Sequence, residues 1–294
     1  MAGTPSRREL LQVMGVAGLG ASAALAGCSA PEQPKGDATS ARAVTAASTA
    51  TPTPSGDGVF RFATASDGHL GEPKTDSRRY LKEFVAALNR VDAATPLEFV
   101  VVNGDIGHGG VTLLEEAKQG LGALSAPLLA TQGNHDQVSA ADWTRIWGTP
   151  ANVVRRFGER SVVCANTSNL AGDYLCADET WLERALQGEA GQRDVFVFMH
   201  ITPNTWTRFG VACPQVRDVL AGAANVRAVF NGHDHDETGV KVDQGVHYVF
   251  DAHYGGHWGT SYRAFRVVEV EASRLVTWLV TTAGERLAET SIAW

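Results

Sequence analysis

Positive charge is scarce in this sequence of 294 residues, and no internal repeat is visible in it. Lys and Arg total 25 against 32 Asp and Glu, which gives a formal net charge of −7, and no basic run occurs after residue 58. A surface without a basic run does not attract polyanions over a distance, so we expect no nucleic-acid partner. Any affinity for a phosphate group must therefore come from a local site.

The first 27 residues resemble an export signal and not part of a folded domain. Arg7 and Arg8 form a twin-arginine pair, which a short and weakly apolar stretch follows. Leu25-Ala26-Gly27-Cys28 resembles a bacterial lipobox, in which Cys28 takes a lipid and becomes the mature N-terminus. The alternative is an uncleaved membrane anchor, but the stretch is too short and too rich in glycine to span a bilayer well.

The chain after the signal divides into a linker and one domain. Residues 28–57 consist mostly of Ala, Thr, Pro, Ser and Gly, which cannot bury enough surface to offset their ordering entropy. They predict a disordered tether that holds the domain away from a membrane. Residues 58–294 have the size of a single domain. We therefore expect an exported bacterial lipoprotein on the outer face of the cell membrane or on its periplasmic side.

Three cysteines remain once Cys28 is assigned to the lipid. They allow at most one internal disulfide, and Cys164 and Cys176 are the nearest pair in the sequence. Three buried thiols are an equally good interpretation, because free cysteine is one of the most frequently buried residues.

Strand and helix patterns alternate through the first two thirds of the domain and give way to strands alone. This pattern predicts an α/β fold with mixed sheets, in which βα units come first and antiparallel strands last, and two sheets pack together with helices outside. We expect strands at 60–65, 97–103, 128–131, 195–199, 226–230, 247–251, 262–270 and 275–280, and helices at 80–88, 112–124, 143–147, 181–186 and 215–221.

Five polar clusters each follow an apolar strand or lie in the loop beyond it. Open α/β sheets bind ligands beyond the carboxyl ends of their strands, so this placement predicts a site. The clusters are Asp67-Gly68-His69, Gly104-Asp105, Gly133-Asn134-His135-Asp136, Met199-His200 and Gly232-His233-Asp234-His235.

Imidazoles, carboxylates and one amide, without a thiolate, suit ions such as Zn, Fe or Mn. A two-metal site needs an anionic ligand between its ions, and Asp105 is the candidate for this bridge. We expect Asp67, His69 and His235 to complete the coordination of one ion, and Asn134, His200 and His233 to complete that of the other.

A hydroxide held between two such ions is a nucleophile near neutral pH and attacks phosphorus in line. His135 is adjacent to Asn134 but is not needed as a ligand, so it is free to protonate the leaving oxygen as a general acid. His108, His253 and His257 lack a motif and are expected to be loop residues. Trp206 and Arg208 lie close enough to His200 in sequence to border a substrate, although packing for Trp206 and solvent for Arg208 are the simpler expectations.

The ordered set of clusters, from Asp67 to His235, resembles the calcineurin-like metallophosphoesterases. The resemblance implies a four-layer sandwich of two mixed β-sheets flanked by helices, the ligand assignments above and His135 as the catalytic acid. His108 stands where the Ser/Thr phosphatases have Asp and the purple acid phosphatases have a ligating Tyr. The pattern is more similar to the class III cyclic-nucleotide phosphodiesterases.

The sequence thus predicts an exported, lipid-anchored phosphoesterase with two metal ions, a small phosphoester substrate and a preference for phosphodiesters. A phosphomonoesterase or nucleotidase of the same fold is the first alternative. The second is a surface lipoprotein without activity that uses the fold to bind a partner.

Overall fold

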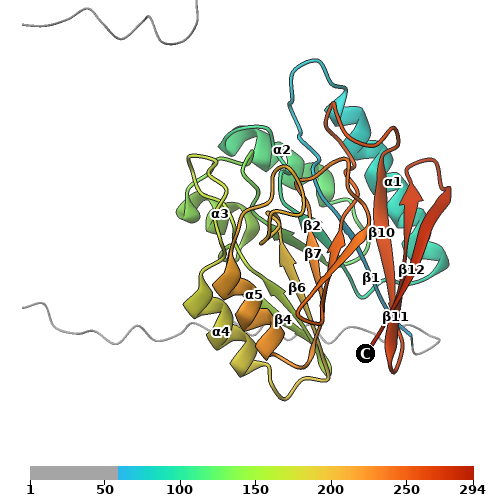
Figure 1. Ribbon diagram of the computed structural model, residues 1–294. Helices are drawn as coiled ribbons and strands as arrows, with labels where there is room; N and C mark the ends of the chain where they lie inside the picture. Colours follow the sequence, from blue (N-terminus) through green and yellow to red (C-terminus); the bar gives the residue numbers. More distant parts are fainter. Residues whose placement is uncertain (1–58) are drawn as a thin grey trace, which may run out of the picture. The chain divides into compact units, whose positions relative to one another are not determined.

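The computed structural model describes residues 59–294, which form two six-stranded mixed β-sheets with helices on their outer faces (Figure 1). This arrangement confirms the predicted fold class. The export signal with Cys28, and the tether up to residue 57, lie outside the described residues. Among the residues that are described, no helix is both long and apolar enough to cross a bilayer.

The first sheet has the strand order β12-β11-β10-β1-β2-β3. Strands β1, β2 and β3 are mutually parallel, and β10, β11 and β12 continue the sheet as antiparallel neighbours. The strands of this sheet are β1 (Phe60–Ala65), β2 (Phe99–Asn103), β3 (Leu128–Thr131), β10 (Ala264–Val270), β11 (Arg274–Thr281) and β12 (Arg286–Ala293).

The second sheet has the strand order β4-β5-β6-β7-β9-β8. Its four central strands are parallel, and each edge strand is antiparallel to its neighbour. The strands of this sheet are β4 (Val153–Phe157), β5 (Arg160–Cys164), β6 (Asp194–Met199), β7 (Val226–Asn231), β8 (Val240–Asp243) and β9 (Val246–Phe250).

Side-chain alternation along the strands creates the layers. In β1, Phe60 and Phe62 point into the space between the sheets, whereas Ala63 and Ala65 point toward the helices. Stacked and edge-on phenylalanine pairs fill the space between the sheets, including Phe62 on Phe99 with ring centroids 4.8 Å apart. The helices α1 (Ser77–Ala94), α2 (Val111–Leu121) and α3 (Ala140–Trp147) cover the first sheet, and α4 (Glu179–Gly188) and α5 (Pro214–Gly222) cover the second.

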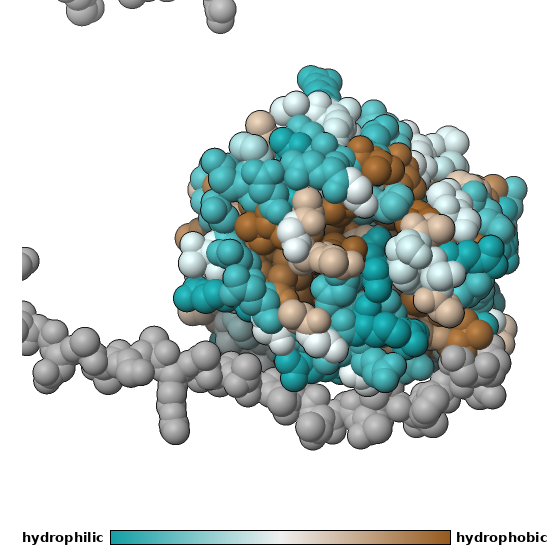
Figure 2. All heavy atoms as spheres, turned by 60° about the horizontal axis from the view of Figure 1, so that its bottom comes forward, coloured by the Kyte–Doolittle hydropathy of each residue, from teal (hydrophilic) through white to brown (hydrophobic). Residues whose placement is uncertain are grey.

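The carboxyl ends of the parallel strands gather at one edge of the sandwich, which faces the upper part of Figure 1, where β6 points. The loops after β1, β2, β3, β6 and β7 therefore meet there. Figure 2 shows the domain with its lower side turned forward, and hydrophobic and hydrophilic surface alternate on that side. The polar clusters of the sequence all belong to the upper loops.

Four strands were not expected from the sequence: β4, β5, β8 and β12. Strands β4, β8 and β12 are sheet edges, and they carry polar side chains such as Arg156, Lys241 and Glu289 in place of an apolar run. An edge strand contacts the core only in part, so its sequence does not need to be apolar. Strand β5 is buried but is only five residues long, and Arg160 opens it.

The cysteine pairing corrects the expectation for this part of the chain. Cys176 forms a disulfide with Cys213, and not with Cys164. Cys164 ends β5 with its side chain between the two sheets, and burial raises the pKa of its thiol to about 12. Proximity in the sequence was misleading, because the chain folds the loop before α4 onto the loop before α5.

Candidate metal centre

The loops that carry the polar clusters turn back sharply where the strands end. Asp67, His69, Asp105 and His233 adopt left-handed backbone conformations, with φ between 45° and 71°. Residues with a Cβ rarely adopt this conformation, and such strain is typically retained where the surrounding structure and function require it. Four of the eight positive-φ non-glycine residues in the described part of the chain are predicted ligands.

Glycines of the clusters permit the close approach of these loops. Gly104 has a φ of 84°, and a Cβ there would lie 2.4 Å from the His200 ring. A Cβ on Gly133 would lie 2.1 Å from the backbone nitrogen of Asp105. The Gly-Asp and Gly-Asn-His-Asp patterns are thus steric requirements of the site as well as parts of a motif.

The first ligand group consists of Asp67, His69 and His235. Nε2 of His69 lies 3.1 Å from Nε2 of His235 and 3.7 Å from Oδ1 of Asp67. Nε2 of His235 is 3.2 Å from the same Asp67 oxygen. All three side chains are buried, and their potential ligand atoms lie within 4.8 Å of one another.

The second ligand group consists of Asp105, His200 and His233, which are also buried with ligand atoms within 4.8 Å of one another. Nε2 of His200 is 3.3 Å from Oδ2 of Asp105. The other His200 nitrogen, Nδ1, lies 2.7 Å from the carbonyl oxygen of Asn103 and is thus held as a donor to it. Asn134 comes from the adjacent loop and is buried as well.

Asp105 stands between the two groups. Its Oδ2 lies 3.7 Å from Nε2 of His69 and 3.3 Å from Nε2 of His200, whereas its Oδ1 accepts a 2.7 Å hydrogen bond from the backbone amide of His135. One carboxylate oxygen therefore faces both groups. This is the geometry that a bridging ligand requires.

The donor atoms at this centre fit two cations. Four buried side-chain atoms of the predicted ligands have no hydrogen-bond partner among the described residues, which is costly unless a bound ion contacts them. They are Oδ1 of Asp67, Oδ1 of Asn134, Nε2 of His200 and Nε2 of His233. The set of carboxylate, amide and imidazole donors suits divalent ions and does not identify the element.

The charges at the centre are tightly balanced. Burial raises the pKa of Asp67 and of Asp105, but nearby imidazoles outweigh it and hold both pKa values below the usual range, with His235 acting on Asp67 and His200 on Asp105. Burial lowers the pKa of His200, but the two carboxylates raise it to about 10. Burial, aided by His200, lowers the pKa of His233 to about 3. A cation that binds His200 must displace its proton.

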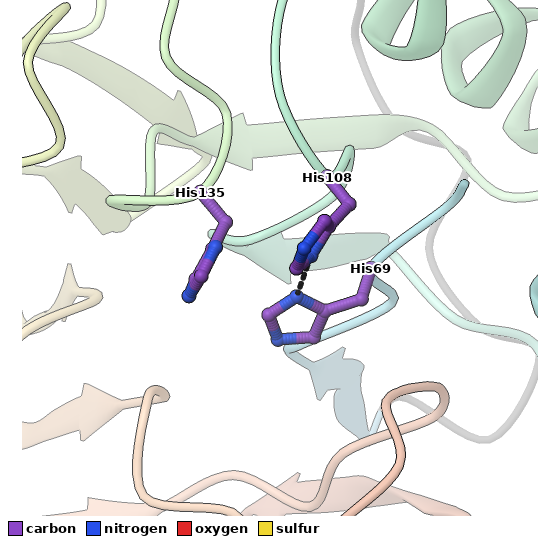
Figure 3. Close-up of side chains that lie close together, drawn as sticks. All are labelled: His69, His108 and His135. Carbon is purple, nitrogen blue, oxygen red and sulfur yellow. Dashed lines mark hydrogen bonds between the residues drawn. The ribbon is translucent and has the colours of Figure 1, made fainter. Parts of the chain in front are cut away.

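His108, expected to be a loop residue without a role in the site, lies beside His69 and His135 (Figure 3). Its Nδ1 is 3.1 Å from Nδ1 of His69, and its ring stacks on that of His135 with centroids 4.7 Å apart. If His69 uses Nε2 as a ligand, as the sequence predicts, its neutral imidazole carries the proton on Nδ1 and donates it to His108. The three histidines have ligand atoms within 4.8 Å of one another, but this tautomer makes them a hydrogen-bonded support and not a third metal site.

No pattern in the sequence predicted two other residues that contact the centre, His253 and Trp258. The ring of His235 lies between those of Trp258 and His253, with centroids 4.3 and 5.0 Å away, and its Nδ1 contacts the carbonyl oxygen of Trp258 at 3.2 Å. His253 and Trp258 belong to the loop between β9 and β10, about 20 residues after the last cluster. Only the folded chain brings them to His235.

Three further residues considered in the sequence, Trp206, Arg208 and His257, have their main contacts with residues other than the predicted ligands. Trp206 packs against Tyr248 beside the second sheet, with ring centroids 4.7 Å apart. Arg208 is exposed and stands over the ring of Phe209 at 5.2 Å. His257 pairs with Glu72.

Comparison with known proteins gives one family match. The family described as calcineurin-like phosphoesterase matches residues 60–237. No curated protein matches the chain.

Solved structures show similarity of fold. A dimetal phosphatase from Danio rerio is similar with a TM-score of 0.61 and 16% identity, over 80% of this chain and 99% of that chain. The calcineurin-like phosphoesterase YfkN from Bacillus subtilis has a TM-score of 0.47 and 11% identity, over 80% of this chain and 90% of that one. A Zn²⁺ complex of Vps29 from Entamoeba histolytica has a TM-score of 0.46 and 12% identity, over 80% and 99%.

Proposed function

The chain belongs to the calcineurin-like phosphoesterase family, and we propose that it hydrolyses phosphodiesters with two metal ions. Asp67, His69 and His235 would hold one ion, and Asn134, His200 and His233 would hold the other, with Asp105 between them. The observation that carries this proposal is the set of buried, unpartnered oxygen and nitrogen atoms just beyond the ends of four strands, β1, β3, β6 and β7.

The protein's own residues position the reaction. Two ions held by these residues would lower the pKa of a bound water and stabilise charge on the phosphoryl oxygens. Oδ2 of Asp105 would screen the repulsion between the two ions, while its Oδ1 accepts the 2.7 Å hydrogen bond that fixes the His135 backbone. The His135 ring contacts His69 at a centroid distance of 4.9 Å, close enough to serve a leaving oxygen at the centre.

The preference for diesters rests on the scarcity of cationic donors. A monoester dianion carries more charge than a diester monoanion, and enzymes that prefer it commonly add Arg or Lys. Residues 103–110, 132–137 and 231–236 contain neither. Arg208 is exposed and lies over Phe209, so it is a cationic candidate that would favour a monoester.

A direct test compares an aryl diester with its matching monoester, using the metal-reconstituted protein at one pH and one salt concentration. We expect a higher kcat/KM for the diester. A monoester preference of tenfold or more, about 1.4 kcal/mol, would overturn the diester assignment and favour a phosphomonoesterase or nucleotidase. Absence of metal-dependent turnover on both would favour a surface lipoprotein without activity.

We further propose that the protein is exported and lipid-anchored at Cys28. The twin-arginine and lipobox patterns support this, and so does the Cys176–Cys213 disulfide, because disulfides persist mainly in oxidising compartments. Replacement of Cys28 by Ala should release the protein from the membrane fraction or leave it unprocessed. Solubility of the wild-type mature protein without detergent would contradict the anchor.

A further inference from the structure

Three aromatic side chains that the proposed mechanism does not use stand around the metal centre. Tyr174, Phe209 and Trp258 line a cavity of about 190 Å³ together with five of the predicted site residues. They come from the loops between β5 and α4, between β6 and α5, and between β9 and β10. We call these three side chains the aromatic rim.

Each ring of the aromatic rim contacts the imidazole of a proposed ligand. Trp258 stacks on His235 with an interplanar angle of 6° and a centroid distance of 4.3 Å. Tyr174 and Phe209 meet His233 edge-on, with centroids 4.5 and 5.6 Å away. Phe209 also meets Trp258 edge-on at 5.5 Å. The aromatic rim therefore extends the cavity directly outward from the ligand atoms.

Apolar surface continues outward from the aromatic rim. Four large hydrophobic side chains are exposed among residues 59–294, and three of them belong to one loop: Leu170, Tyr174 and Leu175, at 61%, 40% and 39%. The fourth, Val242, lies on β8. Apolar side chains clustered beside a cavity mark a surface that a ligand covers.

The disulfide holds two sides of the aromatic rim together. Cys176 is two residues from Tyr174, and Cys213 is four residues from Phe209. The two rings lie on different loops, and the disulfide is the covalent link between these loops. A fixed spacing between the two loops favours binding of a flat group beside these rings, because less ordering is required on binding.

We propose that the aromatic rim binds a flat, uncharged ring on the phosphoester, and that this ring is the group that remains on phosphorus. The inference rests on the proposed function and narrows its substrate class. The His135 ring contacts His69 and His108, whereas the aromatic rim contacts His233 and His235. A leaving group that receives a proton from His135 would therefore lie in a different part of the cavity from a group that the aromatic rim holds. A monoester has no second group to place there.

A binding experiment tests the aromatic rim without requiring turnover. The metal-loaded protein is titrated by calorimetry with phenylphosphonate and with methylphosphonate, which share the charged head and differ in the group on phosphorus. We expect phenylphosphonate to bind at least about tenfold more tightly, equivalent to about 1.4 kcal/mol. Equal dissociation constants would overturn the proposal.

Variants locate the preference. Phe209→Ala and Tyr174→Ala should each reduce the ratio of the two dissociation constants at least about threefold, whereas Tyr174→Phe, which keeps the ring, should preserve it. Val242→Ala removes exposed apolar surface that does not line the cavity and serves as the matched control. A preference that survives both alanine variants would place the ring elsewhere and overturn the assignment to the aromatic rim.

A turnover experiment separates the inference from the proposed function. The substrates are 4-nitrophenyl phenyl phosphate and 4-nitrophenyl methyl phosphate, which release the same nitrophenolate. We expect at least about tenfold higher kcat/KM for the phenyl ester, and a smaller ratio in Phe209→Ala. Equal hydrolysis of both esters would refute the aromatic rim and leave the phosphodiesterase intact. If neither ester is hydrolysed but phenylphosphonate still binds preferentially, the proposed function fails and the aromatic rim stands.

Discussion

His69 and His200 occupy equivalent places in the two ligand groups, but different parts of the chain hold them. The second nitrogen of His200 contacts the carbonyl oxygen of Asn103 at 2.7 Å, and its ring is fully buried under Gly104. The second nitrogen of His69 contacts the side chain of His108, which is only half-buried. A backbone carbonyl is present whatever the residue, whereas a side-chain partner depends on one amino acid. The group around His69 should therefore be the more sensitive to substitution.

Removing the residue that both groups share should have the largest effect. Asp105→Ala is expected to lower the content of both metals and to reduce kcat/KM by about 10³-fold or more, because it removes the negative charge between the ions. Elemental analysis and turnover on an aryl diester measure this. Asp218→Ala on α5 is a control in which an exposed carboxylate is lost. Loss of one ion with nearly normal turnover would show that Asp105 does not bridge.

His135 lies beside the His69 group but is not one of its predicted ligands. Its removal should therefore lower turnover without lowering metal content. His135→Ala is expected to keep both metals and to slow esters with poor leaving groups by ~10²–10⁴-fold, because an alkoxide needs a proton. Nitrophenyl esters should lose much less activity, since nitrophenolate leaves without a proton. Equal losses on both ester types would exclude His135 as the acid.

Removing the side-chain support of His69 should weaken one group alone. His108→Phe is expected to reduce affinity for one ion by ~10–100-fold, the usual effect of losing the partner of a ligand histidine. His108→Asn should restore part of the affinity, because its amide oxygen accepts the same proton from His69. Metal titration followed by chelator competition measures both, with His247→Phe on β9 as a control. Equal weakening of both ions would remove the distinction between the groups.

The smallest effect on turnover is expected for the disulfide. The double variant Cys176→Ser, Cys213→Ser opens a link across 37 residues, which should lower the free energy of unfolding by about 2–4 kcal/mol. Metal content should remain normal, because His200 is the one proposed ligand on either linked loop and it lies at the β6 end of its loop, 13 residues before Cys213. Thermal unfolding measures the change in stability, and elemental analysis measures the metal content. Loss of an ion would mean that the linked loops also hold the metal centre.

The sequence was informative where a residue acts next to its own strand. Asp67, Asp105 and His200 each follow a buried apolar run, so their common edge follows from the pairing of parallel strands. The fold class is confirmed for the same reason, because apolar runs and turn residues define most of the strands that pair inside the sheets.

Partners that meet only through the fold could not be predicted. His108 has a local position three residues after Asp105, but its contact with His69 depends on the parallel bridge between Leu70 and Gly107. Trp258 reaches His235 through the loop between two late strands, and Cys213 reaches Cys176 across two loops. No periodicity or spacing encodes these contacts. Edge strands such as β12 could not be predicted either, because many of their side chains are polar and exposed to solvent, so they lack an apolar run.

The disulfide also bears on the order in which the protein would bind its metals and form its covalent cross-link. If the chain crosses the membrane already folded, as its twin-arginine pattern predicts, Cys176 and Cys213 leave the cytoplasm as thiols, because that compartment is reducing. The seven proposed ligands do not depend on the covalent link, so ions can enter before export. The two loops would be tied only afterwards. The protein would thus acquire its metals inside the cell and the final spacing of the loops beside its cavity outside it.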